Sequence, residues 1–160
     1  MIQATTENTF DFEVQTEDNR INTSVASTQI RHLVKFTNDM DKSTQYAYGS
    51  TETIYNRYTY FKMLYNTTPN VFHGQVNLKP SGYYKYEVYE VSWVGSVVLN
   101  SINAPATEND VLTPPSDDKG IVQGLVTKGK MYLADAAGTA QVQYTQRQEP
   151  SGTNYIYYGQ

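Results

Sequence analysis

The stretch "LKPSGYYKYEVYEV", residues 78–91, decides the fold class of this chain of 160 residues. It holds four tyrosines and two valines, and aromatic and β-branched residues favour β-strands. Successive side chains of a strand point to opposite faces, so one face of this strand carries Tyr84, Tyr86 and Val88. We expect this face to pack against a hydrophobic core.

The opposite face of the same strand mixes phenol rings with charges, since Tyr83 and Tyr89 flank Lys85 and Glu87. Such a mixture suits cross-strand pairing on a solvated face. It also suits a protein–protein contact, where tyrosine is enriched because it is large, rigid and amphipathic. Strand packing is the preferred interpretation. A platform that stacks on sugars or bases is the least favoured one, because the chain has a single tryptophan, Trp93.

Segments on both sides of this stretch also have strand signatures. Residues 9–14 and 29–36 alternate apolar and polar side chains with a period of two. Residues 71–78 are expected to pair with the opening stretch in an antiparallel hairpin, because "KPSG" (Lys79–Gly82) has the residues of a type I turn. Further strands are expected at residues 53–65, at 92–100, on both sides of a turn at Lys128–Gly129, and in the closing segments 140–148 and 154–160.

The fold class follows from the spacing of these signals. No segment combines a helix start, a helical stripe of apolar residues and a helix stop. Many short strands separated by turn residues are typical of a sandwich of two sheets. We therefore predict an all-β protein, an antiparallel β-sandwich of the jelly-roll or immunoglobulin-like kind, in which residues 1–160 form a single domain.

Residues 101–120 interrupt the strand pattern and are expected to form a loop or arm. They contain three prolines and four acidic residues but few large aliphatic side chains. Such a segment cannot bury enough apolar area to offset a backbone ordering cost of about 1–2 kcal/mol per residue, so it should be mobile on its own. Val111 and Leu112 lie at its middle and are candidates for an apolar anchor that reaches a neighbouring subunit. The alternative is a loop without a partner.

Residue types that carry catalysis or bind metals are scarce. The chain has no cysteine, which excludes disulfides, thiol nucleophiles and thiolate metal sites. Its two histidines, His32 and His73, lie in separate strand patterns without a carboxylate at useful spacing, so packing roles are expected for both. The acidic loops 38–44 and 116–120 lack the spacing of a calcium loop, and neither a nucleophile elbow nor a phosphate-binding loop is present. We predict a protein that is not an enzyme, with no catalytic, cofactor or metal site and no small-molecule ligand.

The net charge of −4 argues against a nucleic-acid partner, since binding nucleic acid normally needs a dense positive field. No apolar run is long enough to span a membrane, and "MIQATTENTF" lacks signal-peptide features, so we expect a soluble protein made in the cytoplasm. The charge is unevenly distributed. Residues 1–53 carry eight acids and four bases, whereas residues 119–160 carry two acids and four bases. This polarity favours head-to-tail alignment of copies, although salt screens it.

One long run resembles a known class of proteins. The run "YTYFKMLYNTTPNVFHGQVNLKPSGYYKYEVYEVSW" (residues 58–93) is similar to small virion structural proteins of tailed bacteriophages, including marine and crAss-like phages. In pattern the resemblance covers residues 50–160. It implies a β-sandwich auxiliary, decoration or connector protein of the virion, made in the host cytoplasm and present in repeated copies. Its implied partners are the major capsid protein or other virion subunits, and it assigns no role to any individual residue.

Two classes of function follow. The preferred hypothesis is an auxiliary or decoration protein that binds the capsid shell through residues 101–120 and exposed strand edges, with a head-to-tail connector of the same virion as the nearest alternative. The other class is a carbohydrate-binding or adhesion module with Trp93 and neighbouring tyrosines as its stacking platform. The candidate partner contacts are Tyr83, Tyr89, Trp93, Val111 and Leu112.

Overall fold

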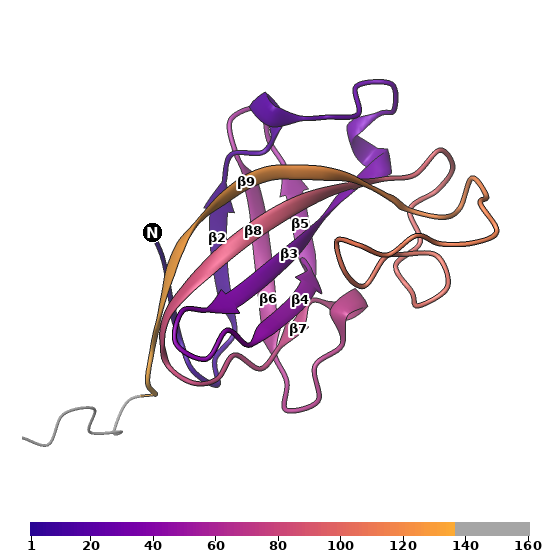
Figure 1. The fold of residues 1–160 in the computed structure, drawn as a ribbon. Coiled ribbons are helices and arrows are strands. Elements are labelled where there is room, and N and C mark those ends of the chain that lie inside the picture. The colour runs from indigo at the N-terminus through magenta and orange to yellow at the C-terminus, as the bar shows by residue number, and fades with distance from the viewer. Residues whose placement is uncertain (137–160) are drawn as a thin grey trace, which may run out of the picture.

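This computed structural model describes residues 1–136 of the chain (Figure 1). These residues contain nine strands and three short 3₁₀ helices, joined by loops. No α-helix occurs among these residues, which confirms the predicted all-β class. The segments 140–148 and 154–160, predicted as strands, lie outside the described residues. The elements are β1 (Ile2–Thr5), β2 (Phe10–Val14), η1 (Glu17–Asn19), η2 (Ser27–Gln29), β3 (Ile30–Asn38), β4 (Thr44–Tyr48), β5 (Thr51–Ile54), β6 (Thr59–Tyr65), η3 (Val71–His73), β7 (Gln75–Val76), β8 (Gly82–Ser92) and β9 (Ile121–Ala134).

The strands form two sheets that pack face to face, as predicted for a sandwich. The five-stranded sheet has the order β1-β9-β8-β3-β4, and the four-stranded sheet has the order β2-β6-β5 with β7 beside β6. The sandwich is not wholly antiparallel, because β1 pairs with β9 and β6 pairs with β7 in parallel. The register between β8 and β9 shifts at Val88/Tyr89 and at Glu90/Val91. Such bulges increase local twist, which accords with the strong curvature of these two long strands in Figure 1.

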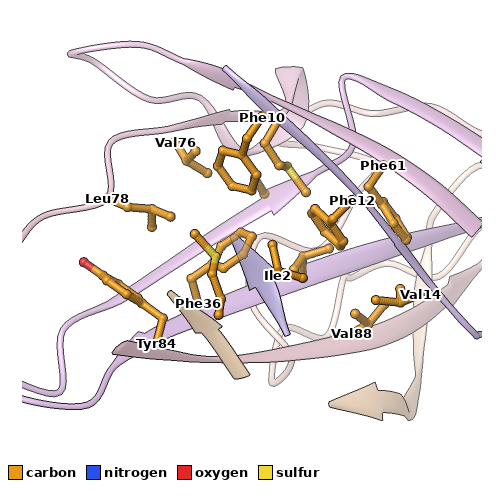
Figure 2. Close-up of a cluster of buried hydrophobic side chains, with 14 of the residues drawn as sticks. Ile2, Phe10, Phe12, Val14, Phe36, Phe61, Val76, Leu78, Tyr84 and Val88 are labelled. Carbon is orange, nitrogen blue, oxygen red and sulfur yellow. The ribbon is translucent and has the colours of Figure 1, made fainter. Parts of the chain in front are cut away.

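The core between the sheets is built by the inward residues of the alternating strands (Figure 2). Phe12 of β2 stacks on Phe61 of β6 with ring centroids 5.2 Å apart, and it meets Phe36 of β3 edge-on at 6.4 Å. Edge-to-face and offset aromatic pairs of this kind add about 0.5–1.5 kcal/mol beyond their buried area. The three residues expected on the core face of β8 all lie in or against this cluster: Tyr84, Tyr86 and Val88.

The predicted hairpin between residues 71–78 and the opening stretch is wrong. β7 pairs in parallel with β6, whereas β8 pairs with β3 and β9. Val76 and Leu78 are buried in the core between the sheets, so this part of the chain closes one end of the sandwich. The residues after it, 79–81, then carry the chain from the four-stranded sheet to the five-stranded sheet.

Three other strand boundaries differ from the sequence expectation. Residues 53–65 contain a β5–β6 hairpin that turns at Tyr55–Tyr58, where the Tyr55 amide donates to the Tyr58 carbonyl. The strand expected at 92–100 does not form, because β8 ends at Ser92 and residues 93–100 lie outside the strands. No turn occurs at Lys128–Gly129, because β9 runs straight through it. A Cβ atom on Gly129 would lie 2.5 Å from the Tyr86 hydroxyl oxygen, so this glycine makes room for the Tyr86 ring.

Candidate interaction surfaces

Residues 94–120, here named the covering segment, fold back over one end of the outer face of the five-stranded sheet (Figure 1). The Tyr48 hydroxyl donates a 2.7 Å hydrogen bond from this face to the carbonyl of Pro105. A second buried cluster forms here, made of Leu33, Tyr48, Val91, Trp93 and Ala104. The expectation of a mobile arm therefore does not hold for its first half, because sheet side chains supply the contacts that its own sequence lacks.

Trp93 and Tyr89, two of the expected partner contacts, belong to this second cluster. Trp93 is 0% exposed, and its indole nitrogen donates a 3.2 Å hydrogen bond to the Asn103 carbonyl. A Cβ atom on Gly120 would lie 2.5 Å from the indole ring, so the backbone closes directly onto it. Tyr89 is half-buried and packs against the cluster. Trp93 therefore cannot act as the stacking platform that an adhesion module would need.

Lys35 and Glu108 tie the covering segment to the sheet. The Lys35 ammonium forms an ion pair with the Glu108 carboxylate and lies 5.6 Å from the centre of the Tyr46 ring. The hydrogen bond to Glu108 raises the pKa of Lys35 above its usual value. Burial acts to raise the pKa of Glu108, but hydrogen bonds from Lys35 and Tyr46 outweigh it and leave that pKa lowered. Both groups are therefore charged at neutral pH, and the attachment is ionic.

Asp110 fixes the chain immediately before Val111. Its carboxylate accepts hydrogen bonds from the backbone amides of Ala106 and Thr107, at 2.8 and 3.0 Å, and from the Thr107 hydroxyl at 2.8 Å. Burial acts to raise the pKa of Asp110, but these three hydrogen bonds outweigh it and leave the pKa lowered. The turn that presents Val111 is thus held from inside the covering segment.

Val111 and Leu112 lie at the outer rim of the covering segment. The Val111 side chain is 84% exposed, and Leu112 is half-buried. The two residues border a pocket of about 270 Å³, whose other lining residues include Pro115, Ile121 and Val122. Val111 thus presents an exposed apolar side chain beside a pocket that apolar and charged residues line together, and the contact expected of Val111 and Leu112 stays a prediction.

At its other end, the outer face of the five-stranded sheet is not covered by any segment of residues 1–136 (Figure 1). Tyr83 is 54% exposed and lies opposite Tyr132 of β9, with ring centroids 5.1 Å apart. Next along the strands come Lys85 and Lys130, which are also direct partners across β8 and β9. Tyr83 therefore occupies the accessible surface that the sequence predicted for it.

The two histidines differ in their surroundings. His32 and Glu52 have side chains that are each 2% exposed, with the His32 Nδ1 atom 2.8 Å from a Glu52 carboxylate oxygen. The backbone amide of His32 donates to the other carboxylate oxygen at 3.2 Å. This pair joins β3 of one sheet to β5 of the other, so the expectation that His32 has no carboxylate partner is wrong. His73 is exposed at the end of η3, so the packing role in a strand that was expected for it is wrong.

Glu90 is the other acid that is buried in the described part of the sheet. Its carboxylate accepts hydrogen bonds from the backbone amides of Ile21 and Asn22, at 2.9 and 2.7 Å. In residues 1–136, no group of three His, Cys, Asp or Glu side chains is placed to hold a metal ion. Within the same residues, no helix is long and apolar enough to cross a membrane.

Comparison of the chain with protein-family models, with curated proteins and with solved structures found no match.

Proposed function

We propose that this protein is a non-enzymatic structural protein of a bacteriophage virion, an auxiliary or decoration protein that binds the shell formed by the major capsid protein. The observation that carries the proposal is the exposed Val111, which lies with the half-buried Leu112 beside a pocket, on a part of the covering segment that hydrogen bonds and an ion pair hold in place. The all-β sandwich and the resemblance of residues 58–93 to virion proteins support the same class.

The hydrogen bonds and the ion pair that hold residues 106–110 in place are important, because binding costs less free energy when the contact residues are already fixed. Docking immobilises side chains at a cost of about 0.5–1.5 kcal/mol each, and a mobile arm would add the ordering of its backbone. Here Glu108 and Asp110 hold the chain just before Val111, so most of that cost is met during folding. Such preorganisation suits a small contact that is repeated at many equivalent positions of a lattice.

The polar groups of the core support a structural role. The His32–Glu52 pair connects the two sheets, and the Glu90 carboxylate accepts hydrogen bonds from backbone amides of the segment between η1 and η2. The alternative function, a carbohydrate-binding or adhesion module, is less favoured, because its expected stacking residue Trp93 is fully buried. A connector of the same virion would use the same apolar contact, but it would be present in fewer copies per particle than a protein that binds the shell.

The apolar contact is tested by Val111→Asp in a phage whose genome encodes this chain. Val111 is 84% exposed, so the substitution should change the free energy of unfolding by no more than about 0.5 kcal/mol. We expect incorporation of the variant into purified particles to fall at least about tenfold, because a charge must be desolvated in an apolar contact.

The matched control is Ile102→Asp, which introduces the same charge on the covering segment at a side chain that is 68% exposed and does not line the pocket. We expect this control to enter particles like the wild type. Normal incorporation of a folded Val111→Asp variant would remove Val111 from the proposed contact.

A further inference from the structure

The open end of the five-stranded sheet carries more cations than anions. Lys85, Lys128 and Lys130 point outward from β8 and β9, accompanied by Glu87 and by Asp39 of the β3–β4 turn. We name these five residues the lysine face. Lys85 pairs with Glu87 at 2.7 Å and Lys130 pairs with Asp39, whereas Lys128 is in no ion pair within residues 1–136.

The outer face of the four-stranded sheet, on the other side of the sandwich, has the opposite balance. Asp11 and Glu13 are exposed on β2, and Lys62 of β6 lies across from Asp11. We name these three residues the acidic face. Neither acid is in an ion pair within residues 1–136, although the Tyr60 hydroxyl donates to Asp11 at 3.2 Å. The two outer faces of the sandwich therefore differ in charge.

The spacing of the charges on the two faces matches. Lys128 and Lys130 are separated by Gly129, which faces the core, and Asp11 and Glu13 are separated by the buried Phe12. Side chains two residues apart on a strand repeat at about 7 Å, so two ammonium groups can meet two carboxylates in register.

The two lysines, Lys128 and Lys130, and the two acids, Asp11 and Glu13, also lie at positions where their strands form the edge of a sheet. Among residues 1–136, β2 ends the order of its sheet, and β9 has only β8 beside it at Lys128 and Lys130, because β1 pairs with Met131–Ala134. The two sets are therefore accessible from the side as well as from the face.

We infer that copies of this protein associate head to tail, with the lysine face of one copy on the acidic face of the next. The contact is heterologous, so it generates a ring if the rotation between copies closes and a filament if it does not. Two tyrosines accompany the charges on the lysine face: the exposed Tyr83 and the half-buried Tyr132 lie beside Lys85 and Lys130, and they supply apolar contact area. The inference rests on charge and geometry alone and does not depend on a virion being the site of action.

The test uses sedimentation velocity of the full chain from about micromolar to about millimolar concentration, at about 0.02 M and about 0.5 M salt. We expect the wild type to associate at low salt and to dissociate at high salt. Lys128→Glu/Lys130→Glu makes both faces acidic, and Asp11→Lys/Glu13→Lys makes both faces basic. Each variant alone should associate at least about tenfold more weakly, since like charges then oppose each other.

The decisive experiment is to mix these two variants, because the acidic faces of one variant can then bind the basic faces of the other. We expect the mixture to associate again at low salt. Arg57→Glu/Lys79→Glu changes the net charge as much as the lysine-face variant at exposed sites elsewhere, and it should associate like the wild type. Circular dichroism confirms that every variant is folded.

Three results would overturn the inference: a wild type that stays monomeric at millimolar concentration in low salt, variants that associate like the wild type, or folded variants whose mixture stays monomeric.

Discussion

The indole nitrogen of Trp93 donates a hydrogen bond to the carbonyl of Asn103, and this bond joins the end of β8 to the covering segment. Trp93 is the only tryptophan of the chain and is 0% exposed. Its fluorescence therefore reports on the packing of the covering segment, and it is the probe for the stability predictions that follow.

Tyr48→Phe should destabilise the protein by about 1–2 kcal/mol, because it leaves the Pro105 carbonyl without its buried partner. The measurement is urea unfolding followed by Trp93 fluorescence. Tyr83→Phe is the matched control, since Tyr83 is exposed, and we expect it to stay within about 0.5 kcal/mol of the wild type. Equal effects of the two substitutions would show that the Tyr48 hydroxyl does not anchor the covering segment.

The buried pair His32 and Glu52 should show strong coupling. His32→Leu leaves the buried Glu52 carboxylate with only the backbone amide of residue 32 as its partner and should cost about 3–5 kcal/mol. Glu52→Leu removes the acceptor of both the His32 imidazole and the His32 amide and should cost about 1–3 kcal/mol. The double variant should cost less than the sum by about 1–3 kcal/mol, measured as a double-mutant cycle from urea unfolding. The exposed His73→Leu serves as the control. Additive effects would contradict a direct bond between the two sheets.

Asp110 should make stability depend on acid pH. Its pKa is lowered in the folded protein, despite burial, by hydrogen bonds from Ala106 and Thr107. A lowered folded pKa stabilises the protein above the unfolded pKa, which is about 3.9, and that contribution is lost as pH falls through the folded pKa.

Asp110→Asn should therefore lower the free energy of unfolding at pH 7 by about 1 kcal/mol and flatten its fall at acid pH. Urea unfolding at neutral and acid pH measures both. Asp117→Asn, at an exposed side chain, should change neither. An Asp110→Asn profile that is parallel to the wild-type profile would contradict the assignment.

Gly129→Ala should destabilise the protein by about 1–3 kcal/mol, because the new methyl group overlaps the Tyr86 ring. The same substitution should cost less when Tyr86 is already replaced by Leu, whose shorter side chain leaves room for the methyl group. Thermal or urea unfolding of the four proteins checks this. An undiminished cost in the Tyr86→Leu background would show that the strain comes from the backbone instead.

Local pattern was sufficient to predict the fold class and the main core. The alternation in β2, β3 and β8 depends only on neighbouring residues, so Phe12, Phe36 and Val88 could be placed inward from the sequence alone. Lys128–Gly129 was mistaken for a turn because the same dipeptide also fits a strand where a glycine accommodates a ring from the next strand. Only the position of Tyr86, which is far from Gly129 in the sequence but adjacent to it in the sheet, distinguishes a turn from a continuous strand here.

The covering segment and the His32–Glu52 pair needed long-range information. The apolar area of residues 101–120 alone does not offset their ordering cost, and the contacts that do so come from Tyr48, Trp93 and Lys35 elsewhere in the chain. Glu52 follows His32 by twenty residues and lies on the opposite sheet, so no sequence spacing indicates the pair. The exposure of Tyr83 could be predicted, because strand alternation places it opposite the core face of Tyr84, Tyr86 and Val88.

Quantitative mass spectrometry of gradient-purified particles, from a phage whose genome encodes this chain, tests the proposed function most directly. The measured quantity is the number of copies of this protein for each copy of the major capsid protein. We expect a ratio that corresponds to repeated binding across the shell lattice. Absence of the protein from purified particles would contradict a virion role, and a few copies per particle would contradict binding to the shell.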